Sequence, residues 1–270
     1  MDKLIFFGTG HAMTYRHLYN TSFSLTDGKS HFLTDGGGGN TILRQLELAQ
    51  VDVNTIDHIF LSHLHTDHIL GAIWLARVAG QNLGRASRTT PLTFYGHESV
   101  LQGFRTMCEV ILQTGLLQYF DKEIRFQAVE DNETLHILGR EVTFFDTGAK
   151  KRLQFGYRVR LRDGSHLTFC GDEPLREEGR PYAQKSDHLI HEAMCLTDQE
   201  SLYHPHRISH STVRDAAETA EELGVKHLIL FHTEDDQVDT RKALYEADAK
   251  NYFSGRVSVP NDLESIILTQ

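Results

Sequence analysis

A short segment of the chain concentrates side chains that bind metal ions. His63, His65, Asp67 and His68 fall within six positions and directly follow an apolar run at residues 59–61. Imidazole nitrogens and carboxylate oxygens are ligands that zinc binds at roughly 2.0–2.2 Å. The chain has 17 histidines, so a single histidine says little about function. Four potential metal-binding residues within six positions are, however, unusual for an ordinary polar loop. The segment therefore predicts a metal site with room for two adjacent ions.

The elements around this segment indicate how the four side chains are held. Residues 57–61 are typical of a short buried strand, and residues 69–79 have the apolar spacing of a helix. The ligand types would then lie on the tight loop between strand and helix, at the end of a rigid sheet. We expect His63 and His65 to point to one side, and Asp67 and His68 to the other.

Two further apolar runs also end in ligand types. Residues 167–170 lead into Gly171 and Asp172, and residues 225–231 lead into His232. Because a carboxylate has two oxygens, Asp172 could bridge two metal ions. Each residue alone has an ordinary explanation, a turn aspartate or a histidine at a strand end. Because potential metal-binding residues follow three separate predicted strands, a single shared metal site is favoured.

The pattern His-x-His-x-Asp-His at residues 63–68 resembles the signature of the metallo-β-lactamase-fold hydrolases. In that family a bridging Gly-Asp ligand and a strand-terminal histidine follow the first motif, in the order of Asp172 and His232 here. Residues 191–193 (His-Glu-Ala) and 210–212 (His-Ser-Thr) further resemble elements of the ribonuclease Z-like branch. With Phe-Gly-Tyr before the Gly-Asp strand, the resemblance covers most of the chain.

The resemblance implies a set of site residues and a cofactor. The implied metal ligands are His63, His65, Asp67, His68, Asp172 and His232, and the implied catalytic residues are Asp67, His210 and Glu192. In the family, the histidine that corresponds to His210 handles a proton with support from the glutamate. Physically, Ser211 or Thr212 can cap a helix at residues 213–223, which would project His210 just ahead of it. One or two divalent ions are implied, zinc first, with manganese or iron as alternatives because no sulfur ligand selects among them.

The family pattern is incomplete at one metal ligand. The family has another metal-binding histidine shortly before the Phe-Gly-Tyr segment, but no histidine occurs here between His136 and His166. We expect Gly148 to stand at the vacant position. The first metal would keep two histidines and Asp172, and would be completed by water, substrate or Asp146. The sequence therefore predicts unequal occupancy of the two metal positions and weakened activity.

A second departure concerns the size of the substrate. The tRNA-processing enzymes of the family carry a long glycine- and proline-rich arm between that histidine and the Gly-Asp ligand. Here 24 positions separate Gly148 from Asp172 (172 − 148), which a single hairpin fills. The net charge of −10 also argues against a broad basic surface for nucleic acid. A small anionic substrate is therefore expected as the partner, and tRNA is not.

The expected activity is metal-dependent hydrolysis of a small phosphodiester or cyclic nucleotide by a metal-activated hydroxide. Three alternatives remain open at this point. The same fold also supports lactone or thioester hydrolysis. A ribonuclease Z-type cut at the 3′ side of tRNA is a second alternative. A binding protein that lost its catalytic power with the missing histidine is the third.

The remainder of the sequence indicates an α/β (α+β) fold. With 270 residues, 40% hydrophobic and 24% charged, the chain is large enough for a sizeable core, and we expect a single domain over residues 1–270. Many short strands with helices near both ends predict a four-layer αββα sandwich of two mixed sheets with the helices outside, as the metallo-β-lactamase fold implies. The strands expected between the two helical regions are residues 124–128, 134–138, 142–145, 155–161 and 166–170.

Cysteine usage and hydropathy indicate where the protein works. Cys108, Cys170 and Cys195 are odd in number and far apart, which is typical of reduced thiols in the cytoplasm. No segment approaches the roughly 20 apolar residues of a membrane span. A helix is expected from residue 97 to about residue 116, and its apolar stripe could serve the core or a subunit contact, which leaves a homodimer open.

Overall fold

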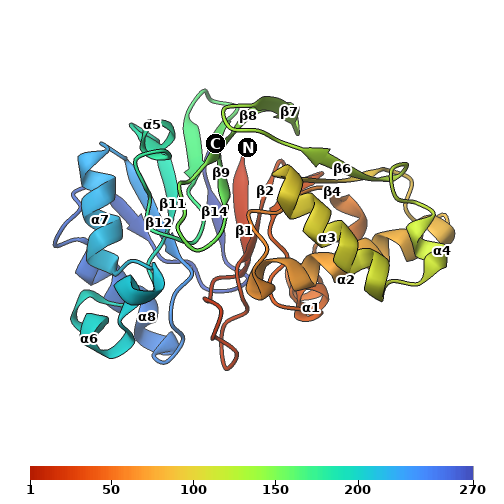
Figure 1. The fold of residues 1–270 in the computed structure, drawn as a ribbon. Coiled ribbons are helices and arrows are strands. Elements are labelled where there is room, and N and C mark those ends of the chain that lie inside the picture. The colour runs from red at the N-terminus through yellow and green to blue at the C-terminus, as the bar shows by residue number, and fades with distance from the viewer. Residues whose placement is uncertain (270) are drawn as a thin grey trace.

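A computed structural model describes residues 1–269 as two β-sheets packed face to face, with helices against the outer face of each (Figure 1). The first sheet has the order β14 (Ser265–Ile267), β1 (Lys3–Gly8), β2 (Ser22–Thr26), β3 (His31–Thr34), β4 (Ile56–Phe60), β5 (Leu92–Gly96) and β6 (Ile124–Ala128). The second has the order β13 (Arg256–Ser258), β12 (His227–Phe231), β11 (His188–Glu192), β10 (His166–Phe169), β9 (Phe155–Arg160), β8 (Arg140–Asp146) and β7 (Thr134–Ile137).

Both sheets are mixed, and their parallel parts matter most for the site. Strands β3 to β6 are parallel neighbours in the first sheet, and β10 to β13 are parallel neighbours in the second. The remaining pairs are antiparallel. Parallel strands present their carboxyl ends at the same edge of a sheet, and this edge is where ligand sites form in α/β proteins.

The inner core is rich in aromatic side chains that interdigitate between the sheets. Phe23 of β2 contacts Phe169 of β10 edge to face, with ring centroids 5.3 Å apart. Phe60 of β4 packs on Phe144 of β8 at the same separation, 5.3 Å. Because each aromatic ring buries a large apolar area, these contacts fix one sheet on the other. The strand ends of the two sheets therefore keep a fixed relative position.

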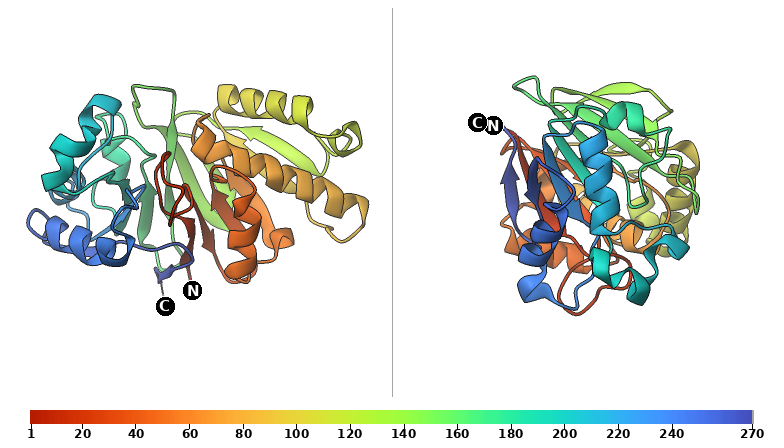
Figure 2. Two further views of the ribbon diagram at one scale, coloured as in Figure 1. Left: turned by 90° about the horizontal axis from the view of Figure 1, so that it is seen from below. Right: turned by 90° about the vertical axis from the view of Figure 1, so that its left-hand side faces the viewer.

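Helices cover the outer faces in two separate groups, as the two further views show (Figure 2). The first sheet is covered by α1 (Thr41–Leu48), α2 (Thr66–Gly84), α3 (Glu98–Ile111) and α4 (Thr114–Leu117). The second is covered by α5 (Arg180–Ala183), α7 (Val213–Glu222) and α8 (Val238–Ala249), with the short α6 (Glu200–Tyr203) in the connection before α7. The predicted αββα arrangement of two mixed sheets is confirmed.

Several predicted boundaries were wrong. The helix after the metal-binding segment begins at Thr66, not at residue 69, so Asp67 and His68 belong to its first turn and not to a loop. The helix expected at residues 97–116 ends at Ile111, where Leu112 turns extended, and α4 follows separately. Strands β11 and β13 were not predicted. Both are short and follow polar segments, so an alternating apolar pattern is weak there.

Cys108, Cys170 and Cys195 are buried free thiols. Among residues 1–269, none of the helices has the length and apolar character that spanning a membrane requires.

Candidate metal centre

Carboxyl ends of strands from both sheets meet at one edge of the sandwich. In the second sheet Asp172 follows β10, Glu192 ends β11 and His232 follows β12, and these three strands are parallel. In the first sheet Asp35 follows β3 and His63 follows β4, again as parallel neighbours. The strand order thus brings residues that are far apart in sequence to the same edge.

The first group of ligand types consists of His63, His65 and Asp172. The Nε2 atom of His63 lies 2.8 Å from Nδ1 of His65 and 3.6 Å from Oδ2 of Asp172. His63 and Asp172 are buried, while His65 is half-buried. The two imidazoles and one carboxylate oxygen therefore face a common point.

The second group consists of Asp67, His68, Asp172 and His232, all buried. Nε2 of His68 lies 3.1 Å from Oδ2 of Asp67 and 3.2 Å from Oδ2 of Asp172. Nε2 of His232 lies 3.6 Å and 3.5 Å from the same two oxygens. Asp172 is common to both groups, and a single oxygen, Oδ2, faces the histidines of each. Every residue expected to bind a metal is therefore found in one of two adjacent clusters.

Two observations agree with divalent ions at these points. Ligand atoms bonded at about 2.1 Å around a tetrahedral ion are separated by roughly 3.3–3.6 Å, and most of the distances above fall at or near that range. In addition, Nε2 of His68 and Nε2 of His232 are buried without a hydrogen-bond partner among residues 1–269. Since unpaired buried polar atoms are costly, these two nitrogens need a ligand of their own. The donor set of imidazole and carboxylate fits zinc, manganese or iron.

Asp35 fixes the orientation of His68 and was not among the predicted site residues. Its Oδ2 accepts hydrogen bonds from Nδ1 of His68 at 2.8 Å and from the hydroxyl of Ser62 at 2.6 Å, and its Oδ1 accepts one from the backbone N–H of Ser62 at 2.8 Å. In the neutral imidazole a proton on Nδ1 leaves the lone pair on Nε2, so Asp35 selects the tautomer that can bind a metal. Asp35 directly follows β3, and this position at a strand end could have identified it as a site residue from the sequence.

Gln154 holds the shared carboxylate and was also not predicted. Its Oε1 accepts a hydrogen bond from the backbone N–H of Asp172 at 3.1 Å, and its Nε2 donates to Oδ1 of the same residue. The side chain is 1% exposed and lies against Gly171, whose φ of +82° and lack of a Cβ make room for it. Because Gln154 occupies Oδ1, Asp172 faces both clusters with Oδ2 alone.

Gly148, the expected position of the missing histidine, lies against Glu178 and Arg176. A Cβ atom at Gly148, where φ is +71°, would meet the carboxylate of Glu178 and lie 3.0 Å from Cβ of Arg176. Neither residue belongs to the metal groups. Asp146 instead accepts a hydrogen bond from the backbone of Gly148 at 2.8 Å and belongs to neither group.

His210 and Glu192 lie next to the second group. Nδ1 of His210 is 3.7 Å from Oε2 of Glu192, whose other oxygen accepts a hydrogen bond from the backbone of Ser211 at 2.5 Å. The rings of His210 and His232 have centroids 5.2 Å apart. Thr212 caps α7, because its hydroxyl accepts from the backbone N–H of Asp215 and that aspartate bonds back to Thr212. The cap holds His210 just ahead of the helix, three positions before Val213, as predicted.

Burial and charge set the protonation of these groups. Burial lowers the pKa of His63 and of His232, so both imidazoles are neutral near pH 7 and offer lone pairs. For His68, burial also opposes the charged form, but the carboxylates of Asp67 and Asp35 raise its pKa well above the ordinary value. The negative field that raises this pKa would equally favour a divalent cation beside Nε2.

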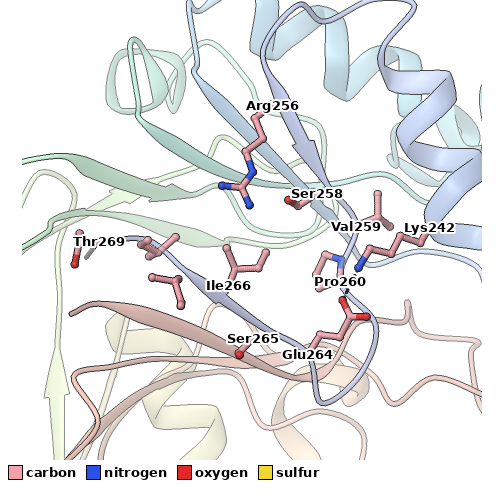
Figure 3. Close-up of a pocket in the computed structure, with 11 residues that line it drawn as sticks. Lys242, Arg256, Ser258, Val259, Pro260, Glu264, Ser265, Ile266 and Thr269 are labelled. Carbon is pink, nitrogen blue, oxygen red and sulfur yellow. Dashed lines mark hydrogen bonds and ion pairs between the residues drawn. The ribbon is translucent and has the colours of Figure 1, made fainter.

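A cleft of about 640 Å³ lies elsewhere, between the edge strands β13 and β14 (Figure 3). It is lined by polar and charged side chains such as Arg256, Lys242 and Glu264, together with Ile266 and Pro260. Lys242 and Glu264 form an ion pair of 2.8 Å at its rim. None of the metal-binding or catalytic candidates lines this cleft, so the chemistry is assigned to the strand ends described above.

Comparison with known proteins gives consistent results. Residues 16–233 match the family described as "Beta-lactamase superfamily domain". Ribonuclease Z of Brevibacillus brevis is 28% identical, and the match covers 96% of this chain and 94% of the relative. The probable metallo-hydrolase YhfI of Bacillus subtilis is 25% identical, with 82% of each chain covered.

Solved structures share the fold over the full length. The crystal structure of YhfI from Bacillus subtilis matches with a TM-score of 0.78 at 20% identity, covering 99% of this chain and 100% of that one. The short form of human tRNase Z matches with a TM-score of 0.75 at 20% identity and covers 100% of both chains. A diphosphatase from the PhnP family matches with a TM-score of 0.74 at 17% identity, covering 100% of this chain and 98% of that one. At these identities the likeness concerns the fold.

Proposed function

The chain belongs to the beta-lactamase superfamily of metal-dependent hydrolases, and from this membership we propose that it hydrolyses a small phosphodiester, such as a cyclic nucleotide. The observation that carries the proposal is the pair formed by His210 and Glu192 beside the metal-binding candidate His232. Relatives and neighbours that bear the names ribonuclease and diphosphatase support phosphate chemistry on this scaffold.

Bound divalent ions would lower the pKa of a water molecule and offset negative charge on the phosphoryl oxygens. His63, His65 and Asp172 would hold one ion, and the second group would hold the other. Asp67 would also accept a hydrogen bond from the attacking water at its carboxylate. These assignments follow from the two clusters and from the fit of their spacing to metal coordination.

His210 would donate a proton to the leaving alkoxide from Nε2. Glu192 faces the opposite nitrogen, Nδ1, at 3.7 Å and is fully buried, so its charge would support the protonated imidazole. The pKa of His210 is raised, since the hydrogen bond and charge of Glu192 outweigh the effect of burial. A general acid matched to an alkoxide suits a phosphodiester, whereas lactone and thioester hydrolysis need none of this kind.

The connections around the centre favour a small substrate over tRNA. Within residues 1–269, β8 and β9 are joined by residues 147–154, and β9 and β10 by residues 161–165. Neither connection is long enough to reach over a large nucleic acid. With a net charge of −10, the chain also lacks the positive balance of proteins that grip RNA through their backbone phosphates.

The His210→Ala variant tests the proposal. The wild type reconstituted with zinc or manganese should hydrolyse bis(p-nitrophenyl) phosphate or a cyclic nucleotide, and His210→Ala should reduce kcat by about 10²–10⁴-fold. Its metal content should stay at the wild-type level, because His210 is not among the proposed ligands. His136→Ala, which changes an exposed histidine on β7, is the matched control and should retain full activity.

The same assays separate the alternatives. Turnover of a lactone or thioester without turnover of any phosphodiester would replace the proposal by carboxylic ester chemistry. Cleavage of a precursor tRNA with a 3′ trailer would restore the ribonuclease Z alternative. If the wild type binds no metal, or hydrolyses neither the phosphodiesters nor the lactones and thioesters, a binding protein would be favoured.

A further inference from the structure

Residues 147–154, the loop between β8 and β9, lie beside the metal centre and carry a lysine toward it. The base of the loop is closed by a backbone hydrogen bond of 3.0 Å from Thr147 to Gln154, whose side chain holds Asp172. Lys151 lies within this loop and is exposed. The loop therefore connects a solvent-facing cation to a residue that contacts the shared carboxylate.

Glu173 fixes the backbone of the loop at Lys151. This glutamate follows Asp172 directly and is 3% exposed. Its two oxygens accept hydrogen bonds from the backbone N–H groups of Lys150 and Lys151, at 3.0 and 3.2 Å. Hydrogen bonds to a buried carboxylate are among the stronger ones in proteins. The position of Lys151 is thus set from the same strand end that presents Asp172.

The ammonium of Lys151 reaches the proposed general acid. Its Nζ lies 3.1 Å from Nε2 of His210, the nitrogen opposite Glu192. Within the described part of the chain, no carboxylate pairs with the Lys151 ammonium. A cation without a carboxylate partner therefore lies against His210, beside the metal centre.

We infer that Lys151 is a substrate-binding residue whose ammonium turns from Nε2 of His210 to a negatively charged non-bridging oxygen of the phosphoryl group, which frees Nε2 to carry the proton that His210 donates. The inference rests on the proposed function and narrows it, because it requires a substrate with a formal negative charge at the reacting group. Phosphodiesters have this charge, whereas neutral carboxylic esters and lactones lack it. In a chain of net charge −10, one fixed cation at the centre is the protein's own means of attracting such a group.

Adjacent lysines provide a matched test. Lys151→Met and Lys150→Met remove the same charge from neighbouring positions, but only Lys151 has its ammonium at His210. A hydrogen bond to a charged group contributes about 1.5–3 kcal/mol, which corresponds to about 10–100-fold in affinity. Lys151→Met should therefore raise the KM for bis(p-nitrophenyl) phosphate and the dissociation constant of inorganic phosphate by about that factor. Lys150→Met should change both by less than about twofold, and Lys151→Arg should restore most of the binding.

Further measurements distinguish a failure of the inference about Lys151 from a failure of the proposed function. Metal content should be equal in all variants, and hydrolysis of the neutral ester p-nitrophenyl acetate, where present, should not respond to Lys151→Met. Equal phosphate affinity of Lys151→Met and Lys150→Met would overturn the inference while leaving the proposed function intact. A loss of kcat on anionic and neutral substrates alike, with KM unchanged, would instead assign Lys151 to holding His210. If the wild type hydrolyses no phosphodiester, the proposed function fails, and calorimetric phosphate binding by the variants still decides the inference.

Discussion

At the scale of single residues, Asp35 and Gln154 determine how the potential metal ligands are oriented toward one another. Asp35 sets the tautomer of His68, and Gln154 takes one oxygen of Asp172. Neither belongs to a recognisable motif. Asp35 follows the apolar residues of β3, so the rule that identified Asp172 and His232 would also have identified it. Gln154 gave no such signal, since it lies at the end of a loop and acts only through the fold.

Replacing Gln154 tests whether it positions the shared carboxylate. Gln154→Met keeps the length and burial of the side chain but removes both hydrogen bonds to Asp172. We expect zinc affinity to fall by about 10–100-fold, as is typical when a residue that orients a metal ligand is lost. The affinity is measured by competition with a coloured chelator.

Gln45→Met is the control for this prediction. Gln45 is also buried, but it donates to the backbone of Phe7 and to Asp262, away from the metal groups. This variant should lose comparable stability and keep its zinc affinity. Equal zinc affinity in Gln154→Met and the wild type would show that Asp172 is held without the glutamine.

At the scale of elements, strand ends were more predictable than helix starts. The apolar runs before His63, Asp172 and His232 identified β4, β10 and β12 because buried parallel strands are nearly continuous in apolar residues. The start of α2 was missed because the sequence from His63 to His68 is polar except for Leu64 and gives no helical periodicity. An acidic residue in the first turn, here Asp67, is favourable beside the helix N-terminus and marks the true start.

The cap of α7 leads to a prediction about stability. Thr212→Ala removes the hydroxyl that accepts from the backbone of Asp215 and that donates to its carboxylate at 2.7 Å. We expect the free energy of unfolding, measured by urea titration, to fall by about 1 kcal/mol. Thr219→Ala in the same helix is the control, and it should be neutral or slightly stabilising because alanine has the higher helix propensity. An unchanged unfolding free energy for Thr212→Ala would show that the capping box contributes nothing.

At the scale of the whole molecule, the centre exists because two sheets bring distant strand ends together. His63 and His65 come from the first sheet, and Asp172 and His232 come from the second. The spacing of residues 63–68 indicated the chemistry, and the density of strands indicated a sandwich. The pairing order of the strands, the intervening strand β11 and the contacts of Gln154 could not be predicted, since they depend on long-range packing that no local pattern encodes.

Calorimetric titration of the metal-free protein with zinc, compared between the wild type and Asp172→Asn, tests the central claim most directly. Asp172 is the one residue shared by both groups, and the two groups have three and four protein ligands. We predict that the wild type binds zinc at two positions of unequal affinity and that Asp172→Asn weakens both. Binding that is the same in the variant and the wild type, or the absence of zinc binding by the folded wild type, would contradict the account.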